Sequence, residues 1–119
     1  MGPIRDNTTI LTYGLVKKDI EGLKKIISNC KLYDTEVWQD IIATNYTLAI
    51  INPDYLCDEA LEALKEYFCE GYPFSESVIL TKYCEKLVNL KGIITNTTLL
   101  QDKDSAKSEI LIHLEKVSQ

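Results

Sequence analysis

Apolar residues occur along this chain in two alternating patterns: short dense runs, and longer stretches with a single apolar stripe. The short runs cover residues 8–13, 30–33, 47–51, 77–81 and 93–95. They are rich in β-branched and aromatic residues, which favours β-strands. The run at 47–51 is apolar at almost every position, which is typical of a strand buried on both faces of a parallel sheet.

The stretches between these runs have the spacing of amphipathic helices. In the first of them, Val16, Ile20, Leu23 and Ile27 follow one another at steps of four, three and four, so they form one apolar stripe. In the second, Val37 is the first of the apolar residues that are expected on the buried side of the helix. The helices are predicted over residues 16–27, 37–42, 58–70, 85–90 and 105–117.

Two of these helices are preceded by side chains that can cap them. Asp34 or Thr35 can accept hydrogen bonds from the free backbone amides of the second helix. Asp102 or Asp104 can do the same for the last helix.

Alternation of five strands with five helices indicates right-handed βαβ crossovers and a parallel sheet between two helical layers. A chain of 119 residues forms one domain, spanning residues 1–119. We therefore predict a three-layer α/β, flavodoxin-like (βα)5 fold with strand order 2-1-3-4-5. This order brings residues 12–14, after the first strand, close to residues 52–54, after the third. In such sheets the chemistry lies beyond the carboxyl ends of the strands.

With this order of elements, the chain resembles a response-regulator receiver domain over almost its whole length. Receivers carry a phospho-accepting aspartate at the end of the third strand, and a proline soon after it. In this chain Ala49-Ile50-Ile51-Asn52-Pro53-Asp54 occupies that place, and Asn52 aligns with the acceptor. The family also ends its fourth strand in Ser or Thr, a position that Thr81 fills in Val78-Ile79-Leu80-Thr81.

The groups that perform phosphoryl transfer in receivers are replaced here. Thr12, Tyr13 and Gly14 stand in place of the acidic pair after the first strand, and residues 95–97 in place of the lysine after the fifth. Phosphoryl transfer needs a carboxylate nucleophile and a divalent cation, and Mg²⁺ prefers carboxylate oxygens. The resemblance therefore implies a degenerate pseudo-receiver, with Asp54 as the one nearby substitute acceptor.

The first functional hypothesis is a stand-alone module, not an enzyme, that acts in signalling or regulation through phosphorylation-independent protein–protein contacts. In receivers the face formed by the fourth helix, fifth strand and fifth helix usually binds partners. In this chain that face comprises residues 86–90, 93–95 and 105–117, and two copies can pair through it.

The alternative is a small flavodoxin-like enzyme or ligand-binding protein that takes a nucleotide, flavin or phosphosugar. A purely structural subunit is a third option. The strand-end cleft of the alternative comprises Thr12, Tyr13, Asn52, Asp54 and Thr81. The amide of Asn52 and the hydroxyl of Thr81 either line such a site or simply tie down local backbone.

Composition and charge limit the classes of partner that the chain can bind. Lys and Arg total 13 against 18 Asp and Glu, a formal charge of −5, which argues against binding to nucleic acid or an anionic membrane. The sequence has neither an apolar run of ~18 residues nor the apolar core of a signal peptide, so we expect a cytoplasmic protein. It contains no phosphate-binding glycine motif, so we expect no cofactor.

The cysteines predict no metal site. Cys30, Cys57, Cys69 and Cys84 form no C-x-x-C pair, and His113 is the one histidine. Structural zinc sites usually draw their ligands in close pairs. We therefore expect reduced thiols that fill the core and helix faces, with disulfides as the alternative.

Overall fold

The fold is built on one parallel sheet of five strands, β1 (Thr9–Tyr13), β2 (Lys31–Thr35), β3 (Leu48–Ile51), β4 (Ser77–Leu80) and β5 (Ile93–Thr95). The structure is a computed structural model, and it describes residues 9–27, 30–44, 46–69, 77–88, 90 and 92–118. Every neighbouring pair of strands is parallel, in the order β2-β1-β3-β4-β5. The predicted strand order is thereby confirmed, and the architecture is consistent with a flavodoxin-like fold.

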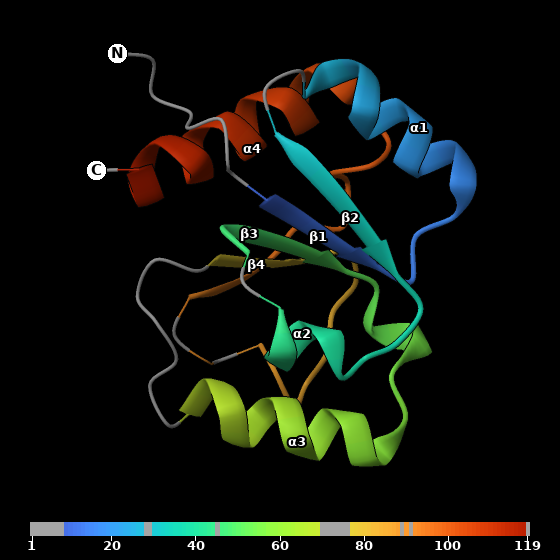
Figure 1. The fold of residues 1–119 in the computed structure, drawn as a ribbon, viewed down its shortest axis with the longest axis vertical. Helices are drawn as coiled ribbons and strands as arrows, with labels where there is room; N and C mark the ends of the chain where they lie inside the picture. The colour runs from blue at the N-terminus through green and yellow to red at the C-terminus, as the bar shows by residue number, and fades with distance from the viewer. Residues whose placement is uncertain are drawn as a thin grey trace.

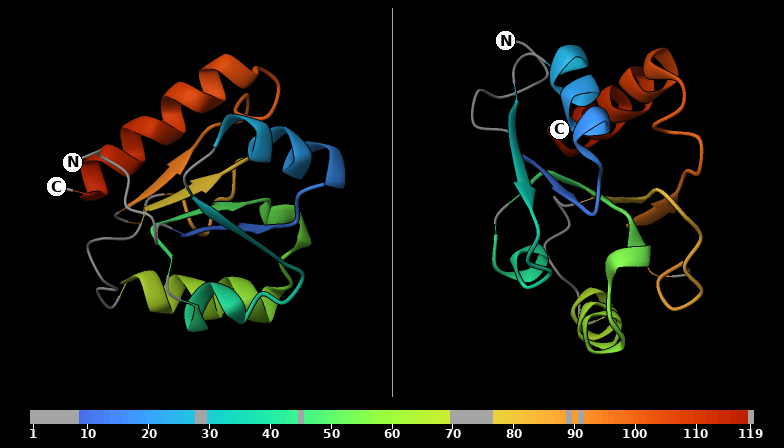
Figure 2. Two further views of the ribbon diagram at one scale, coloured as in Figure 1. Left: turned by 45° about the horizontal axis from the view of Figure 1, so that its top comes forward. Right: turned by 90° about the vertical axis from the view of Figure 1, so that its right-hand side faces the viewer.

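Helices cover both faces of this sheet (Figures 1 and 2). The helices α1 (Lys17–Ile26) and α4 (Lys103–Ser118) lie on one face, and α2 (Asp40–Ala43) and α3 (Asp58–Cys69) lie on the other. A short 3₁₀ helix, η1 (Pro53–Tyr55), follows β3 directly. The molecule therefore has the three layers that the alternating pattern predicts.

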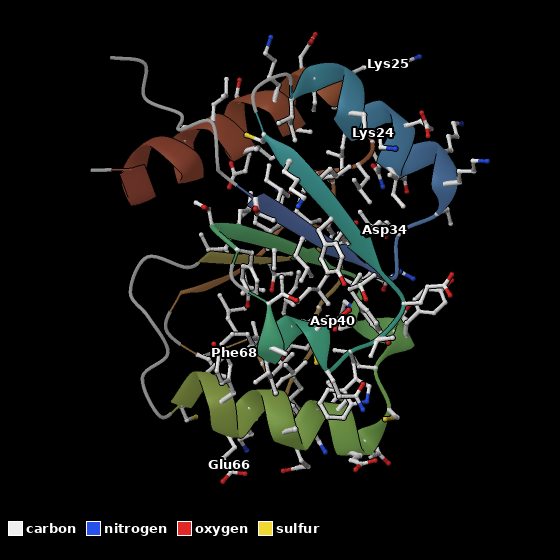
Figure 3. All side chains as sticks on the ribbon, in the orientation of Figure 1. Lys24, Lys25, Asp34, Asp40, Glu66 and Phe68 are labelled. Carbon is white, nitrogen blue, oxygen red and sulfur yellow. The ribbon has the colours of Figure 1, made fainter. Side chains whose placement is uncertain are left out.

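The core is divided by the sheet because successive side chains of a strand point to opposite faces. Ile10, Leu48, Ile50 and Ile79 pack with Leu23 of α1 and Ile110 of α4. On the other face, Leu11, Ala49, Ile51 and Leu80 pack with Ile41 of α2 and with Leu64 and Phe68 of α3 (Figure 3). Every residue of β3 is buried, which confirms the prediction of a central strand covered on both sides.

The number of helices differs from the prediction, because the residues that the structure describes form four α-helices and not five. In the described part of the connection between β4 and β5, residues 85–88 form turns and not a helix. Two of their amides share one acceptor, because Leu87 N and Val88 N both donate to Cys84 O, at 3.1 and 2.9 Å.

The second helix is shorter than predicted and starts later, at Asp40. Thr35 continues β2 to its end, and its hydroxyl oxygen accepts a hydrogen bond from Val37 N at 3.0 Å. The same hydroxyl donates to the Asp40 carboxylate at 2.6 Å, so the chain turns before the helix begins. Asp34 and Thr35 are therefore strand residues and not helix caps, and Val37 is 51% exposed instead of buried.

The remaining boundaries agree more closely with the sequence. Asp102 is confirmed as the cap of α4, because its Oδ1 accepts a hydrogen bond from Asp104 N at 3.1 Å. Val16 precedes α1 and is 54% exposed, so it lies outside the apolar stripe predicted for it. The His113 side chain lies outside the described residues.

Among the helices that are described, none combines the length and the apolar character needed to cross a membrane.

Candidate functional site at the strand ends

The segments after β1 and β3 meet at the carboxyl edge of the sheet, as the strand order predicts. Asn52 N donates a hydrogen bond to Tyr13 O at 2.9 Å. Gly14 has φ +76°, a left-handed conformation that side chains rarely adopt. A Cβ on Gly14 would lie 2.9 Å from Cδ2 of Tyr55 and 3.0 Å from Asn52 O. Only glycine therefore allows this close approach between the two loops.

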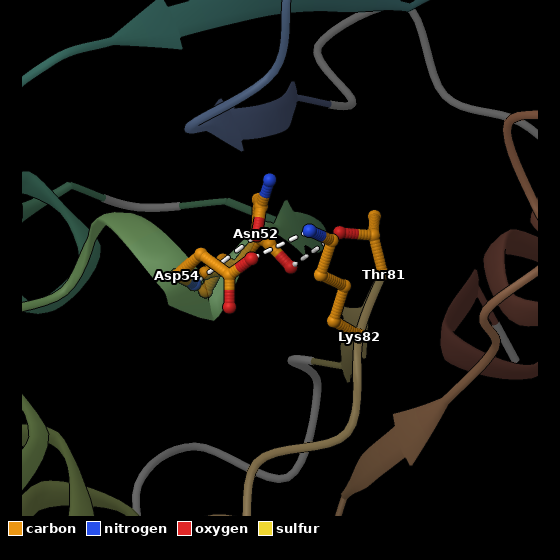
Figure 4. Close-up of polar contacts among 5 residues, drawn as sticks. Asn52, Asp54, Thr81 and Lys82 are labelled. Carbon is orange, nitrogen blue, oxygen red and sulfur yellow. Dashed lines mark hydrogen bonds and ion pairs between the residues drawn. The ribbon is translucent and has the colours of Figure 1, made fainter.

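The side chain of Asn52 fixes the loop that follows β3. Its Oδ1 accepts a hydrogen bond from Asp54 N at 3.1 Å, which caps η1 (Figure 4). The carbonyl of Asn52 also accepts from Tyr55 N at 3.3 Å. Of the two roles considered for this amide, the structure shows the one that ties down local backbone.

Asp54 is paired with a lysine that the sequence analysis did not single out. Lys82 Nζ lies 2.5 Å from Asp54 Oδ2, and both side chains are more than half exposed (Figure 4). The hydrogen bond to Asp54, and then its charge, raise the pKa of Lys82. Lys82 directly follows Thr81, so the parallel register of β3 and β4 was the signal that could have located it.

Thr81 is buried at the end of β4 and bonds to the backbone of the neighbouring strand. Its N–H donates to Ile51 O at 2.9 Å, and its Oγ1 donates to the same oxygen at a longer 3.4 Å. The hydroxyl thus satisfies a main-chain carbonyl of β3.

The hydroxyl groups of Thr12 and Tyr13 do not bond to the side chains of Asn52 or Thr81, and each has another partner. Thr12 is fully buried, and its hydroxyl donates to Asp34 Oδ1 at 2.9 Å, directly across from it in β2. The Tyr13 hydroxyl donates to Tyr55 O at 3.0 Å. Burial, followed by the charge of nearby Cys57, raises the pKa of Tyr13.

A cavity of about 290 Å³ opens beside these residues, at the carboxyl ends of β1 and β2. Its lining residues are Tyr13 at the end of β1 with Gly14 and Leu15 after it, Asp34 and Thr35 at the end of β2 with Glu36 after them, and Tyr55 of η1. Of the five residues predicted for the strand-end cleft, Tyr13 lines this cavity, whereas the other four, Thr12, Asn52, Asp54 and Thr81, do not. The cavity thus lies between β1 and β2, and not over β3.

A second polar cluster anchors the start of α2. Asp40 Oδ2 accepts hydrogen bonds from the Thr35 hydroxyl at 2.6 Å and from the Tyr33 hydroxyl at 2.9 Å. These two bonds, that from Thr35 first, lower the pKa of Asp40. The cluster joins the edge strand β2 to the helix α2 and has a structural role.

The four cysteines are unpaired, which confirms the expectation of free thiols. Cys57 and Cys69 are exposed, whereas Cys30 and Cys84 are partly buried, so the thiols fill the core less than expected. Burial raises the pKa of Cys30. Within the described ranges, no group of three or more His, Cys, Asp or Glu is placed to hold a metal ion.

Comparisons of the chain with protein-family models, with curated proteins and with solved structures give no match. The resemblance to receiver domains therefore rests on the strand order and on the positions of Asn52, Pro53 and Thr81.

Proposed function

We propose that this chain is a stand-alone pseudo-receiver that acts through protein–protein contacts without being phosphorylated. The observation that carries the proposal is the hydrogen bond between Asn52 Oδ1 and Asp54 N. At the position of the receiver's nucleophile, the side chain is an amide that caps backbone. An amide is not a useful nucleophile, because phosphoryl transfer requires a negatively charged oxygen.

The surroundings of Asn52 support the same proposal. Tyr13, which stands where receivers carry acidic residues, is 6% exposed and packs in the core beneath Tyr55. Asp54, the substitute acceptor, is held by Lys82. A lone carboxylate paired with an ammonium group offers Mg²⁺ few of the oxygen ligands that it prefers.

The proposed contact between two copies involves β5 and α4. Ile94 is 40% exposed on β5, and Ile112 is 59% exposed on α4. In the described sheet β5 pairs with β4 alone, so its other edge is open to a partner. Lys86, which belongs to the same predicted face, is bonded instead to Glu62 of α3 at 2.9 Å. The proposed face is therefore centred on β5 and α4. The proposal includes a cytoplasmic location and a protein partner, with no nucleic acid or membrane.

The second candidate, a small flavodoxin-like enzyme or ligand-binding protein, would use the cavity at the ends of β1 and β2. Its volume of about 290 Å³ is just below the ~300–1,000 Å³ typical of small-molecule sites. Its lining includes the carboxyl groups of Asp34 and Glu36, which would repel a nucleotide, flavin phosphate or phosphosugar.

Sedimentation velocity with and without acetyl phosphate and Mg²⁺ tests the leading proposal. We expect the chain to self-associate equally under both conditions, and Ile94→Glu to abolish association. Cys69→Glu, which adds the same charge at an exposed position of α3 on the other face of the sheet, is the matched control and should leave association unchanged. A chain that is monomeric throughout would refute the pairing, and association that requires the phosphodonor would refute the phosphorylation-independent mechanism.

A further inference from the structure

Exposed apolar side chains gather at the carboxyl edge of the sheet. Six large hydrophobic residues are exposed in the part of the chain that the structure describes, and two of them are Ile94 and Ile112. The other four each follow one of the strands β1 to β4: Val16, Val37, Tyr55 and Tyr83, at 54, 51, 61 and 65% exposure. Because the carboxyl ends of parallel strands meet at one edge, we call these four residues the strand-end rim.

Single exposed hydrophobic residues are common on protein surfaces, but three of the rim residues lie at or next to one cavity. Tyr55 lines the cavity at the ends of β1 and β2. Val16 follows its lining residue Leu15, and Val37 follows its lining residue Glu36. Three of the four rim residues are therefore at or directly beside the lining of this cavity, whereas Tyr83 follows β4, two strands away from β1 in the sheet.

The aromatic wall of this cavity is held in position before any ligand arrives. The Tyr55 carbonyl accepts the hydrogen bond from the buried Tyr13 hydroxyl at 3.0 Å. The Tyr55 ring also lies so close to Gly14 that a Cβ there would approach Cδ2 to 2.9 Å. A ring that is 61% exposed and yet fixed at its backbone and at one edge costs little entropy when it is covered.

The charge of the cavity selects a cation. Its described lining includes two carboxylic acids, Asp34 and Glu36, and no lysine, arginine or histidine. The Thr12 hydroxyl donates to Asp34 Oδ1 from the buried side and so orients that carboxylate. The lysine at the neighbouring strand end, Lys82, is paired with Asp54. An organic cation in this cavity can form charge-assisted hydrogen bonds and lie against the Tyr55 ring.

We infer that the strand-end rim is a docking surface for a protein segment that inserts a lysine or arginine side chain into this cavity. A volume of about 290 Å³ suits one long side chain. The apolar rim then contacts the residues that flank the inserted cation in the partner. The inference rests on the proposed protein–protein function and adds the surface and the chemistry of the partner.

A titration of the ¹⁵N-labelled full chain, followed by amide chemical shifts, tests the inference. The probes are acetyl-Leu-Lys-Leu-amide, the same peptide with neutral norleucine for lysine, and n-butylammonium. We expect saturable shifts at Gly14, Leu15 and Glu36, and binding of the lysine peptide about tenfold tighter than the norleucine peptide. Equal affinity for the two peptides would overturn the inference. Equally tight binding of n-butylammonium would also overturn it, because the site would then take a free cation without using the rim.

Variants locate the binding on the molecule. Asp34→Asn keeps an oxygen for the Thr12 hydroxyl but removes the charge, and Glu36→Gln removes the other charge. Each should weaken the lysine peptide about tenfold. The matched control is Glu66→Gln on the outer face of α3, which changes the net charge equally and should not change the affinity (Figure 3). If Glu66→Gln weakens binding as much as the cavity variants do, the attraction is only to the overall charge and the inference fails.

The two proposals fail in different ways. Loss of the expected peptide binding, while self-association stays independent of the phosphodonor, would overturn this inference alone. Phosphorylation of a chain that still binds the lysine peptide would overturn the proposed function and leave the docking chemistry standing.

Discussion

Asn52 Oδ1 accepts a hydrogen bond from the backbone N–H of Asp54 at 3.1 Å, at the position where a receiver domain carries its nucleophile. This one contact links the stability of the strand-end loop to the absence of a reactive carboxylate at residue 52. The loop holds Tyr55 over the cavity beside β1, so its geometry also supports the proposed docking surface.

Removal of the Asn52 side chain should destabilise the fold. Asn52→Ala leaves the Asp54 amide without its acceptor, and the loss of such a cap costs about 1 kcal/mol. Asn52→Asp keeps an oxygen in the same place and should stay within a few tenths of a kcal/mol of the wild type. Urea unfolding followed by circular dichroism measures both. Equal stability of the alanine variant and the wild type would show that the bond is not significant.

Gly14→Ala should cost more than removal of the cap. The substitution places a Cβ at φ +76°, at 2.9 Å from the Tyr55 ring. The left-handed conformation alone costs about 1–2 kcal/mol for a non-glycine residue, and the contact with Tyr55 adds to that cost. Thermal or urea unfolding gives the magnitude.

Gly22→Ala is the control for the effect of the methyl group itself. Gly22 is a helical residue of α1 that lines a groove of about 550 Å³ between α1 and α4. Gly22 has no positive φ, and alanine favours helix by about 1 kcal/mol over glycine. We expect this variant to be at least as stable as the wild type. Destabilisation of Gly22→Ala and Gly14→Ala to the same degree would contradict the special role of Gly14.

Acid should weaken the fold partly through Asp40. Hydrogen bonds from Thr35 and Tyr33 lower the pKa of Asp40 in the folded state, whereas the unfolded chain has an ordinary value near 4. The contribution is therefore fully present above about pH 5, declines as the pH falls past 4, and is lost below the folded pKa. The difference in urea midpoint between wild type and Asp40→Asn, measured from pH 7 to pH 2, should shrink over this window. A difference that stays constant with pH would exclude the carboxylate as its origin.

The sheet could be predicted from sequence, because the pattern of apolar residues within one strand shows whether that strand is buried on both faces. The run from Leu48 to Ile51 is apolar at all four positions, and all four side chains are buried. Such a strand fits only the middle of a covered parallel sheet. The meeting of Gly14 with Asn52 followed from the strand order alone.

On the α3 side of the sheet, α3 was predicted closely, but the short segments 37–42 and 85–90 were predicted less well. Tertiary contacts determine the conformation of short segments more than local periodicity does. Val37 has helical spacing from Ile41, but the Thr35 hydroxyl bonds its amide and turns the chain outward. The segment at 85–88 contains buried Leu87, which packs in the α3-side core from a turn as well as it would from a helix.

The cavity could not be predicted, because its shape depends on side-chain conformations that the sequence pattern does not determine. The sequence placed Tyr13 at the strand end but gave no sign that its hydroxyl would reach Tyr55 O. Asp34 was interpreted as a helix cap, and its true position at the end of β2 puts it in the cavity lining.

The most direct test of the account is incubation of the purified chain with acetyl phosphate and Mg²⁺, followed by intact-protein mass spectrometry. Wild type and Asp54→Asn should both keep their unmodified masses, because Asn52 is an amide and Asp54 is paired with Lys82. A gain of one phosphoryl group by the wild type that is missing from Asp54→Asn would contradict the account, because Asp54 would then be a working acceptor.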